Sequence, residues 1–477
     1  MYVQLKYQSW SEGKSFSMKL EPTMFREYDI RGRETPDELN EESMTYIGRG
    51  YGTFLKRRGV DRVVVGRDCR ATSADFEQAL IAGLTSTGCD VIDIGLSTTP
   101  MLYWAQYHFK TTGGAAVTAS HNPAGWNGVK LAVGYSMTTN SAQVRELYEI
   151  IENESFETGA GTVKESPVDD AYIEDVTKRL GIEGQPRVLL NTGNGSAGVI
   201  GPRLLRAAGC EVVELHTRLD PTFPHYPANP SVVEMMEDTG AHVRSSNAEV
   251  GVAIDADGDR LGVTDENGST IWPDIYMIPI VRELLKEKPG AKVVYDVKCS
   301  AALEEDIRAH GGVPVMWKTG HSFIKEKLAK ENADLGLELS GHIFIVHGYY
   351  GFDDALFSGL RVIESVSNGK RLSEIMQDVP RWFSSPVYNA FCPDEEKYKV
   401  AQQITDRLKA EGYRVIELSG ARVEFGDGWG LVRASSNLPQ LVLRFEGKTE
   451  QRLKEIEQMF RDILKEYPSV ETEWETG

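Results

Sequence analysis

The chain has 477 residues, of which 41% are hydrophobic, and its formal net charge at pH 7 is −19. This length predicts three or four domains, and the acidic balance excludes a nucleic-acid backbone or an anionic membrane as the partner, because either requires a broad basic face. The five cysteines are scattered and unpaired in sequence, the first 18 residues lack a signal-peptide pattern and no apolar run reaches membrane-spanning length, so we expect a cytoplasmic enzyme with reduced thiols.

The first predicted α/β unit spans residues 19–164 and follows an N-terminal extension of residues 1–18. Its FREYDIRG segment carries Tyr28 and Arg31, and arginines here could offer cations to a phosphate. Apolar runs predict a strand at 63–65, a helix that ends at Gly88, a second strand at 89–95 and a third at 115–117.

The third strand leads directly into TASHNP, residues 118–123. Ser120 is thereby expected at a strand end, which is where open α/β sheets bind ligands. Turn-forming residues between Pro123 and Gly128 can fold the chain back and bring Lys130 close to this hydroxyl. A serine beside a base is a candidate nucleophile, and the alternative is an ordinary polar loop.

The second predicted unit, residues 165–270, repeats this pattern of strand, helix and strand. Its strand at 250–254 leads into Asp255, Asp257 and Asp259, which we expect to alternate along an extended segment with all three carboxylates on one side. Converging anions require a cation, and hard oxygen ligands favour Mg²⁺. Two alternatives are a calcium loop with Glu266 as the twelfth position, and a haloacid dehalogenase-like phosphatase with Asp255 as the nucleophile.

The third predicted unit, residues 271–382, repeats the pattern again, with strands at 293–295, 313–317 and 335–337. The last strand leads into Glu338, Ser340 and His342, whose hydrogen-bonding groups suit neighbouring hydroxyls of a sugar. Lys298 and the pair Lys318 and His321 follow the other two strands and would add positive charge to the same edge. The alternatives are a polar turn and solvated lysines.

The fourth predicted unit, residues 383–477, reads as strand, polar loop, strand and a helix with one apolar face. Its loop offers a cation beside hydroxyls and an amide, which suits a phosphate, and consists of Arg433, Ser435, Ser436 and Asn437. The three earlier units share similar helix exits, TGCDV, AGCEV and HGGVP. The sequence therefore predicts three related α/β domains with mostly parallel mixed sheets, plus a C-terminal α+β domain, around a central cleft.

In their order and spacing, these motifs resemble the α-D-phosphohexomutase family, most closely its phosphomannomutase/phosphoglucomutase branch. The resemblance runs from FREYDIRG through GRDCRATS, TASHNP, DADGDR, WKTGHS, ELSGH and YYGFDDALFSGLR to RASSNLPQLVLRFE. It implies that Ser120 carries a phosphoryl group and that Asp255, Asp257 and Asp259 hold Mg²⁺ with a phosphoserine oxygen. It also implies that Lys130 and Arg260 assist proton transfer and charge, and we place His121, beside Ser120, in the same catalytic group.

The resemblance further implies that Glu338 and Ser340 bind sugar hydroxyls, and that Arg433, Ser435 and Asn437 hold the phosphate that is not reacting. We group the remaining substrate-binding candidates with them: Tyr28, Arg31, Lys298, His321, His342 and Ser436. This chain departs from the branch at Leu337-Glu338, where Gly-Glu is usual, and at Ser436-Asn437, where Asn-Thr is usual. Both departures concern substrate preference more than catalysis.

The activity implied by the resemblance moves phosphate between C1 and C6 of glucose and mannose phosphates, through a phosphoserine and a hexose 1,6-bisphosphate that also serves as activator. The RASSNLP loop favours glucose and mannose, because the phosphoglucosamine branch usually carries a Pro-Ser-Gly-Thr version. We expect a monomer or weak dimer whose only partner is a small hexose phosphate. Phosphoglucosamine mutase, a Mg²⁺-dependent sugar-phosphate hydrolase and a non-catalytic calcium-binding module are the alternatives.

Overall fold

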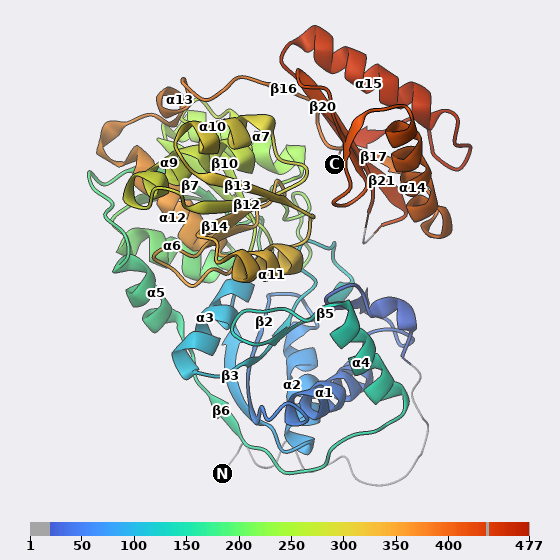
Figure 1. Cartoon of the computed structure of the whole chain (residues 1–477). Helices are drawn as coiled ribbons and strands as arrows, with labels where there is room; N and C mark the ends of the chain where they lie inside the picture. The colour runs from blue at the N-terminus through green and yellow to red at the C-terminus, as the bar shows by residue number, and fades with distance from the viewer. Residues whose placement is uncertain (1–19, 436–437, 477) are drawn as a thin grey trace.

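The computed structural model describes residues 20–435 and 438–476, and the predicted extension of residues 1–18 lies outside them. The described chain forms four β-sheets with helices packed against them (Figure 1). The first three sheets contain both parallel and antiparallel pairs, and the fourth is antiparallel throughout. The predicted fold class is confirmed: three α/β layers and a C-terminal α+β unit.

The first sheet has the strand order β1-β5-β4-β2-β3-β6, with β4, β2, β3 and β6 parallel and β5 antiparallel to β4. Polar side chains begin its helices: Asn40 and Asn140 each form a capping box, and Thr98 caps the third helix just before Pro100. The elements are β1 (Ile30–Arg33), α1 (Glu41–Lys56), β2 (Arg62–Arg67), α2 (Ser73–Ser86), β3 (Asp90–Leu96), α3 (Thr99–Phe109), β4 (Gly113–Val117), β5 (Trp126–Val133), α4 (Ser141–Glu152) and β6 (Val163–Glu165), preceded by η1 (Pro22–Met24).

The second sheet has the order β11-β10-β9-β7-β8, with β7, β8 and β9 parallel and the hairpin strands β10 and β11 antiparallel. Strand β9 is buried along its whole length, which matches its apolar sequence. The elements of this unit are α5 (Asp169–Thr177), β7 (Arg187–Asn191), α6 (Ala197–Ala207), β8 (Glu211–Leu215), α7 (Val233–Ser246), β9 (Val250–Ile254), β10 (Leu261–Thr264) and β11 (Thr270–Ile271).

The third sheet has the order β13-β12-β14-β15, and its last strand is antiparallel. Helix α12, which Asp354 caps, contacts β9, β10 and α6 of the second unit as well as β15 of its own. The elements are α8 (Pro273–Tyr276), α9 (Ile278–Glu287), β12 (Lys292–Asp296), α10 (Ala301–Ala309), β13 (Val313–Trp317), α11 (His321–Glu331), β14 (Leu335–Leu337), β15 (Ile343–Ile345), α12 (Ala355–Val366), η2 (Ser367–Gly369) and α13 (Leu372–Ile375).

The fourth sheet follows the path β18-β19-β20-β21-β17-β22, and β16 pairs with β21 beside this path. Helices α14 and α15 both pack on it. The elements are β16 (Phe383–Ser384), β17 (Tyr388–Phe391), α14 (Asp394–Ala410), β18 (Arg414–Ile416), β19 (Ala421–Glu424), β20 (Gly428–Ala434), β21 (Gln440–Gly447), α15 (Glu450–Leu464) and β22 (Glu475–Thr476).

The buried apolar side chains do not form one separate core for each sheet. One continuous cluster of buried apolar side chains joins α3 of the first unit to the second and third sheets, including Met101, Leu190 and Leu360. The fourth unit has its own core, built around residues such as Phe445 and Phe460. In Figure 1 this unit, drawn in red, stands apart from the other three, and its separate core makes it the part best able to move as a body.

The attachment of the fourth unit to the third combines a small apolar cluster with buried charge. Val297 packs with Trp429 and Leu431. Arg422 donates to the carbonyl oxygens of Val297 and Cys299, at 2.7 and 3.0 Å. Arg444 donates to the carbonyl of Lys298 and pairs with the buried Asp274 at 3.1 Å. The backbone that carries Lys298 is therefore held by two arginines of the fourth unit.

We propose that the four sheets mark four domains with boundaries near residues 164, 270 and 382, since their strands span residues 30–165, 187–271, 292–345 and 383–476. Domains I to IV are used below in this sense. Among residues 20–435 and 438–476 there is no helix whose length and apolar character would let it span a bilayer.

Replacing Arg444 by Met should loosen the attachment of domain IV. The substitution leaves Asp274 buried without its cation, which costs about 3–5 kcal/mol. We expect faster backbone hydrogen–deuterium exchange in residues 297–301. Arg407→Met is the matched control, because Arg407 pairs with Glu411 and Glu466 on the surface, where such pairs contribute up to about 1 kcal/mol. Unchanged exchange in Arg444→Met would contradict this role.

Candidate active site

Ser120 lies three residues after the end of β4, at the carboxyl edge of the first sheet, as predicted. Its backbone has φ = 52°, in the left-handed region, and its amide donates to Thr118 Oγ1 at 2.8 Å. The Oγ atom lies 3.2 Å from His121 Nδ1 and 3.5 Å from Asp255 Oδ2. The hydroxyl of domain I thus meets the aspartate loop of domain II. A non-glycine residue in the left-handed region stores strain of about 1–3 kcal/mol and is characteristic of functional turns.

Two arginines hold the Ser120 loop in place. Arg70 is buried and donates to four backbone carbonyls of the loop, including Ser120 O at 2.7 Å and Pro123 O at 2.9 Å. Arg31 donates to Ala119 O and to Asn122 Oδ1, and its Nε pairs with Asp29 at 2.7 Å. Arg31 therefore supports the loop directly. Carbonyl oxygens that all accept from cations keep the loop rigid and its hydroxyl aimed at the aspartates.

The aspartates converge, but the expected geometry of their segment is wrong. Residues 255–260 form a turn rather than an extended strand, with Gly258 at φ = 87°. Asp255 Oδ1 organises this turn by accepting from the backbone amides of Gly258, Asp259 and Arg260, at 2.9–3.1 Å. The turn, and not the pleat of a strand, brings the three carboxylates together. One ligand oxygen from each aspartate lies within 4.8 Å of the others.

Lys130 contributes positive charge to this cluster and does not act as a free base. It lies on β5, opposite Ala116 of β4, and its Nζ contacts Asp257 Oδ2 at 2.7 Å and also Asp259 Oδ2. Burial alone lowers the pKa of the Lys130 ammonium, but the carboxylates of Asp257 and Asp259 outweigh burial and raise this pKa above its usual value. Lys130 is therefore protonated at neutral pH in this arrangement.

The aspartate cluster fits a divalent cation. Burial, followed by the charges of Asp259 and Asp257, raises the pKa of Asp255 well above its usual value. Burial also opposes ionisation of Asp257, yet Lys130 holds the pKa of that carboxyl below its usual value. The Oδ1 atoms of Asp257 and Asp259 are buried and have no hydrogen-bond partner among the described residues. A bound cation would satisfy these oxygens and favour the ionised form of Asp255.

The calcium-loop alternative is not supported. The aspartate turn lies between the strands β9 and β10 instead of between helices. Glu266, which that alternative needs as the twelfth position, lies in the turn between β10 and β11 and binds the hydroxyl of Ser373. Its carboxylate therefore binds a residue of domain III and does not join the aspartate cluster.

His121 and Arg260 border the cluster on two sides. Burial, followed by the charges of Arg260 and Arg31, lowers the pKa of His121 well below its usual value, so its imidazole is neutral. A neutral ring nitrogen 3.2 Å from Ser120 Oγ can exchange a proton with that hydroxyl. Arg260 is the last residue of the turn and donates from Nε to His342 Nε2 at 3.0 Å.

A cavity of about 860 Å³ lies beside this cluster. Its wall includes side chains from all four predicted units, among them Tyr28, Arg260, His321 and Arg433. The predicted residues therefore fall into two neighbouring groups. Those around Ser120 are Arg31, His121, Lys130 and the three aspartates, and those that line the cavity are Tyr28, Arg260, Lys298, His321, Glu338, Ser340, His342, Arg433 and Ser435. Arg260 and His342 connect the two groups, because both line the cavity and lie close to Asp259.

The cavity presents oxygen acceptors and cations on facing elements. Glu338 is buried, accepts from the amide of Gly320 and lies after β14 with Ser340. Lys298 and His321 come from the ends of β12 and the start of α11, as predicted for the same sheet edge. The ring of Tyr28 packs edge-on against His321 at 4.6 Å between centroids. Lys318 does not line the cavity, and its ammonium lies over the ring of Phe323.

Domain IV contributes the far wall of the cavity. Arg433, at the end of β20, is 7% exposed, and its Nε has no hydrogen-bond partner among the described residues. Burial lowers the pKa of Arg433 although Asp296 and Glu338 raise it. Ser435 lines the same wall, whereas Ser436 and Asn437 lie outside the described residues. A buried guanidinium facing a cavity suits an anionic ligand such as a phosphate.

Several residues near the site were not predicted individually. Arg70 was within the GRDCRATS motif, yet nothing in its spacing indicated four carbonyl contacts. Thr99, at the start of α3, donates to Asp257 Oδ2 at 2.7 Å. Asp353 and Lys325 meet beneath His342. Each acts on a partner more than 10 residues away, so no local pattern could reveal it.

Asp255→Asn should weaken divalent cation binding at least about tenfold. The asparagine keeps the Oδ1 acceptor that organises the turn but places an amide where the Oδ2 ligand stands. Titration with Mn²⁺, followed by the paramagnetic resonance of the free ion, measures the affinity. Glu266→Gln is the matched control and should bind as the unchanged protein does, because Glu266 lies away from the cluster. Equal affinities in all three proteins would contradict the site.

Known proteins are similar to this chain in both sequence and fold. Four models of phosphoglucomutase/phosphomannomutase domains match the chain: α/β/α domain I at residues 22–158, domain II at 170–268, domain III at 272–383 and the C-terminal domain at 388–463. A phosphomannomutase/phosphoglucomutase of Pseudomonas aeruginosa is 38% identical over 94% of this chain and 96% of its own length.

A phosphoglucomutase of Neisseria gonorrhoeae is 35% identical over 93% of this chain and 97% of its own length. The crystal structure of a phosphoglucomutase/phosphomannomutase family protein from Burkholderia thailandensis superposes with a TM-score of 0.89 at 35% identity, covering 95% of this chain and 99% of that one. The matches extend over all four sheets and over the serine, aspartate and cavity loops. The chain belongs to the phosphoglucomutase/phosphomannomutase family.

Proposed function

We propose that this protein is a phosphohexomutase that moves a phosphoryl group reversibly between C1 and C6 of glucose and mannose phosphates. The observation that carries this proposal is the position of Ser120 Oγ, 3.5 Å from Asp255 Oδ2 in an aspartate cluster suited to a divalent cation, beside a cavity with cations on its far wall. One end of a sugar phosphate would face Ser120 while the other end lies near Arg433 and Ser435.

In the first half-reaction, the phosphoryl group on Ser120 Oγ passes to a hydroxyl of the hexose monophosphate. The bond between phosphorus and the serine oxygen breaks as the bond to the sugar oxygen forms, giving a hexose 1,6-bisphosphate. The proton that the sugar hydroxyl loses ends on Ser120 Oγ, which regains its hydroxyl form as it leaves phosphorus. Neutral His121, whose Nδ1 is 3.2 Å from that Oγ, can accept a hydrogen bond from this hydroxyl.

In the second half-reaction, the bisphosphate turns end over end and returns its other phosphoryl group to Ser120. Phosphoryl transfer of this kind depends on positioning and on neutralisation of charge. Lys130 and Arg260 supply permanent positive charge beside the reacting oxygen atoms, and Lys130 does so without acting as a base because its pKa is raised. Of the two expected contributions of Lys130, charge and proton transfer, this arrangement favours charge.

The aspartate cluster would hold Mg²⁺ through Asp255, Asp257 and Asp259, together with an oxygen of the phosphorylated Ser120. When bound, this ion would draw electron density from the phosphoryl oxygens and so favour transfer. The same hexose 1,6-bisphosphate is the proposed activator, because it can phosphorylate Ser120 in molecules that have lost their phosphoryl group.

The protein would hold the non-reacting end of the substrate through substrate groups that are available in both binding orientations. Arg433 and Ser435 offer donors to a phosphate, and Ser436 and Asn437 are proposed to join them from the same loop. Glu338 and Ser340 offer an acceptor pair and a hydroxyl to the sugar, with Lys298 and His321 beside them. The separate core of domain IV would allow this wall to close on the bound phosphate.

Ser120→Ala should reduce isomerisation of glucose 1-phosphate by at least about 10³-fold, because the oxygen that carries the phosphoryl group is lost. A coupled assay for glucose 6-phosphate, primed with hexose bisphosphate, measures the rate. Ser86→Ala is the matched control, since Ser86 ends α2 and, among the described residues, its hydroxyl donates only to the carbonyl of Gly83. Full activity in Ser120→Ala would refute the assignment.

Side-by-side assays of glucose 1-phosphate, mannose 1-phosphate and glucosamine 1-phosphate should show turnover of the first two and at least about tenfold lower kcat/KM for the amino sugar. Preferential turnover of glucosamine 1-phosphate would instead identify the phosphoglucosamine activity. Steady release of inorganic phosphate without isomerisation would identify a hydrolase, with Asp255 as its nucleophile.

A further inference from the structure

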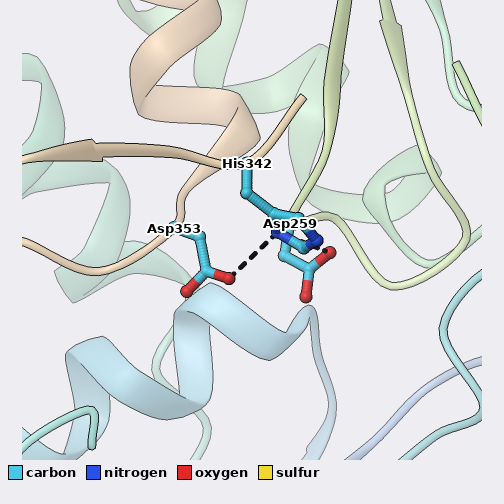
Figure 2. Close-up of side chains that lie close together, drawn as sticks. All are labelled: Asp259, His342 and Asp353. Carbon is cyan, nitrogen blue, oxygen red and sulfur yellow. Dashed lines mark ion pairs between the residues drawn. The ribbon is translucent and has the colours of Figure 1, made fainter. Parts of the chain in front are cut away.

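A second buried cluster lies directly behind the aspartate turn and involves residues from three segments. Figure 2 shows Asp259, His342 and Asp353 close together, and both carboxylates approach the same ring nitrogen, Nδ1. His342 Nδ1 lies 3.0 Å from Asp353 Oδ2 and 3.6 Å from Asp259 Oδ1. All three side chains are at most 4% exposed, so their charges and protons must be satisfied within the protein.

The proton on the imidazole is fixed by Arg260. A guanidinium has only donor groups at any accessible pH, and Arg260 Nε lies 3.0 Å from His342 Nε2. Nε2 must therefore be an acceptor with a free lone pair. In the neutral ring the proton then belongs to Nδ1, which faces Asp353 (Figure 2).

Asp353 is the group that favours this arrangement. Its Oδ2 lies 3.0 Å from His342 Nδ1 as an ion-pair contact without an aligned hydrogen bond, while its Oδ1 accepts from Lys325 Nζ at 3.2 Å. Burial opposes ionisation of Asp353, yet Lys325 and His342 hold the pKa of this carboxyl well below its usual value. An ionised carboxylate facing Nδ1 can only accept, so it selects the same tautomer that Arg260 requires.

We propose that Asp353 is a positioning residue that fixes the Nδ1–H tautomer of His342 and thereby holds the guanidinium of Arg260 between the aspartate turn and the cavity. Lys325 completes the arrangement by keeping Asp353 ionised and oriented; its ammonium also lies 4.3 Å from the centroid of the Tyr103 ring. Asp353 itself does not line the cavity. The consequence for catalysis rests on the proposed function, because Arg260 is placed there as a cation beside the transferred phosphoryl group.

A second cation bound by Asp259, His342 and Asp353 is the competing interpretation, because one ligand atom from each converges there. Two features disfavour it. The lone pair that a metal needs on Nδ1 is taken up by the proton that Arg260 places there. The ammonium groups of Lys130 and Lys325 also already contact the outer oxygens of Asp259 and Asp353.

The test is Asp353→Asn. An asparagine can turn its amide donor toward Nδ1, which would shift the imidazole proton to Nε2, where it opposes the N–H of Arg260. We expect kcat for glucose 1-phosphate to fall about 10–100-fold, while KM changes by less than about threefold, because the carboxylate does not face the cavity.

Asp354→Asn is the matched control. Asp354 is the neighbouring buried carboxylate and accepts from the hydroxyls of Tyr172 and Tyr349 and from the amide of Phe357, in the first turn of α12. It has no contact with His342, so its variant should keep kcat within about twofold even where its thermal stability is lower. A loss of kcat in Asp354→Asn equal to that in Asp353→Asn would overturn the proposal, because buried charge alone would then explain both.

A double-variant comparison tests whether Asp353 acts through the imidazole. In a His342→Gln background, Asp353→Asn should lower kcat by less than about twofold further, because the group it orients is already gone. If Asp353→Asn lowers kcat in the His342→Gln background as much as it does in the otherwise unchanged protein, the proposal is overturned.

The tautomer gives a readout independent of turnover. Nitrogen-15 spectra of histidine-labelled protein, with His342 assigned by its absence in His342→Gln, should show a protonated Nδ1 in the unchanged protein and a protonated Nε2 in Asp353→Asn. A protonated Nε2 in the unchanged protein would overturn the inference even if the enzyme is active. Absence of isomerisation in the unchanged protein with the Nδ1–H tautomer present would refute the proposed function alone.

Titration with Mn²⁺ separates positioning from metal binding. We expect the same number of bound ions in the unchanged protein and in Asp353→Asn, because Asp255 and Asp257 remain intact. A second bound ion that is lost in Asp353→Asn would overturn the proposal in favour of a metal site at this cluster.

Discussion

The structure depends on the balance of buried charge where the first three sheets meet. Asp255, Asp257, Asp259 and Asp353 are all at most 1% exposed, and carboxylates so placed repel one another and have lost their hydration. Their compensation comes from different domains. Lys130 lies on a strand of domain I, Arg260 ends the turn in domain II and Lys325 lies on a helix of domain III. Of these three cations, Lys130 alone pairs with carboxylates of another domain, so domains I and II must dock correctly for the charges of Asp257 and Asp259 to be tolerated.

This constraint also explains why the domains have different roles at the site. One apolar core joins part of domain I to domains II and III, although domain I also has a core of its own, and the shared core fixes the serine, the aspartate turn and His342 relative to one another. Phosphoryl transfer needs such fixed geometry, since misplacement of reacting groups lowers its rate sharply. Domain IV has a separate core and faces the cavity with Arg433. A substrate that must bind in two orientations is better served by a wall that can adjust, and the separate core makes this wall the adjustable part.

The buried network behind the reacting groups has a purpose beyond stability. Ion pairs in a protein interior often contribute little net free energy, because removing the charges from water costs as much as their attraction supplies. The buried contacts here instead orient functional groups: Arg70 orients the serine loop, Lys130 and Thr99 orient Asp257, and Asp353 orients His342. Each contact restricts the position of a group that touches the reacting atoms, or of a residue next to such a group.

The sequence alone determined the order of the elements and the position of each loop. Apolar runs such as the buried Val250–Ile254 and the partly exposed Val313–Trp317 are strands in the structure with the predicted bounds, because a continuous apolar run between turn residues leaves few alternatives. The carboxyl ends of β4, β9 and β14 placed Ser120, the aspartates and Glu338 at sheet edges. The motifs in their order also identified the family.

Only the tertiary structure decided how these loops meet. Asp255–Arg260 is a turn and not an extended segment, because the backbone amides that Asp255 accepts fix it, and a pattern of alternating aspartates does not contain that information. Lys130 is bound to two carboxylates from domain II, which favours its expected contribution of charge over its expected contribution to proton transfer. Asp353 and Lys325 reach His342 from different elements of the third unit. Local sequence sets which groups are present at each strand end, whereas their protonation and partners depend on burial and on contacts between distant segments, which form only when the domains pack.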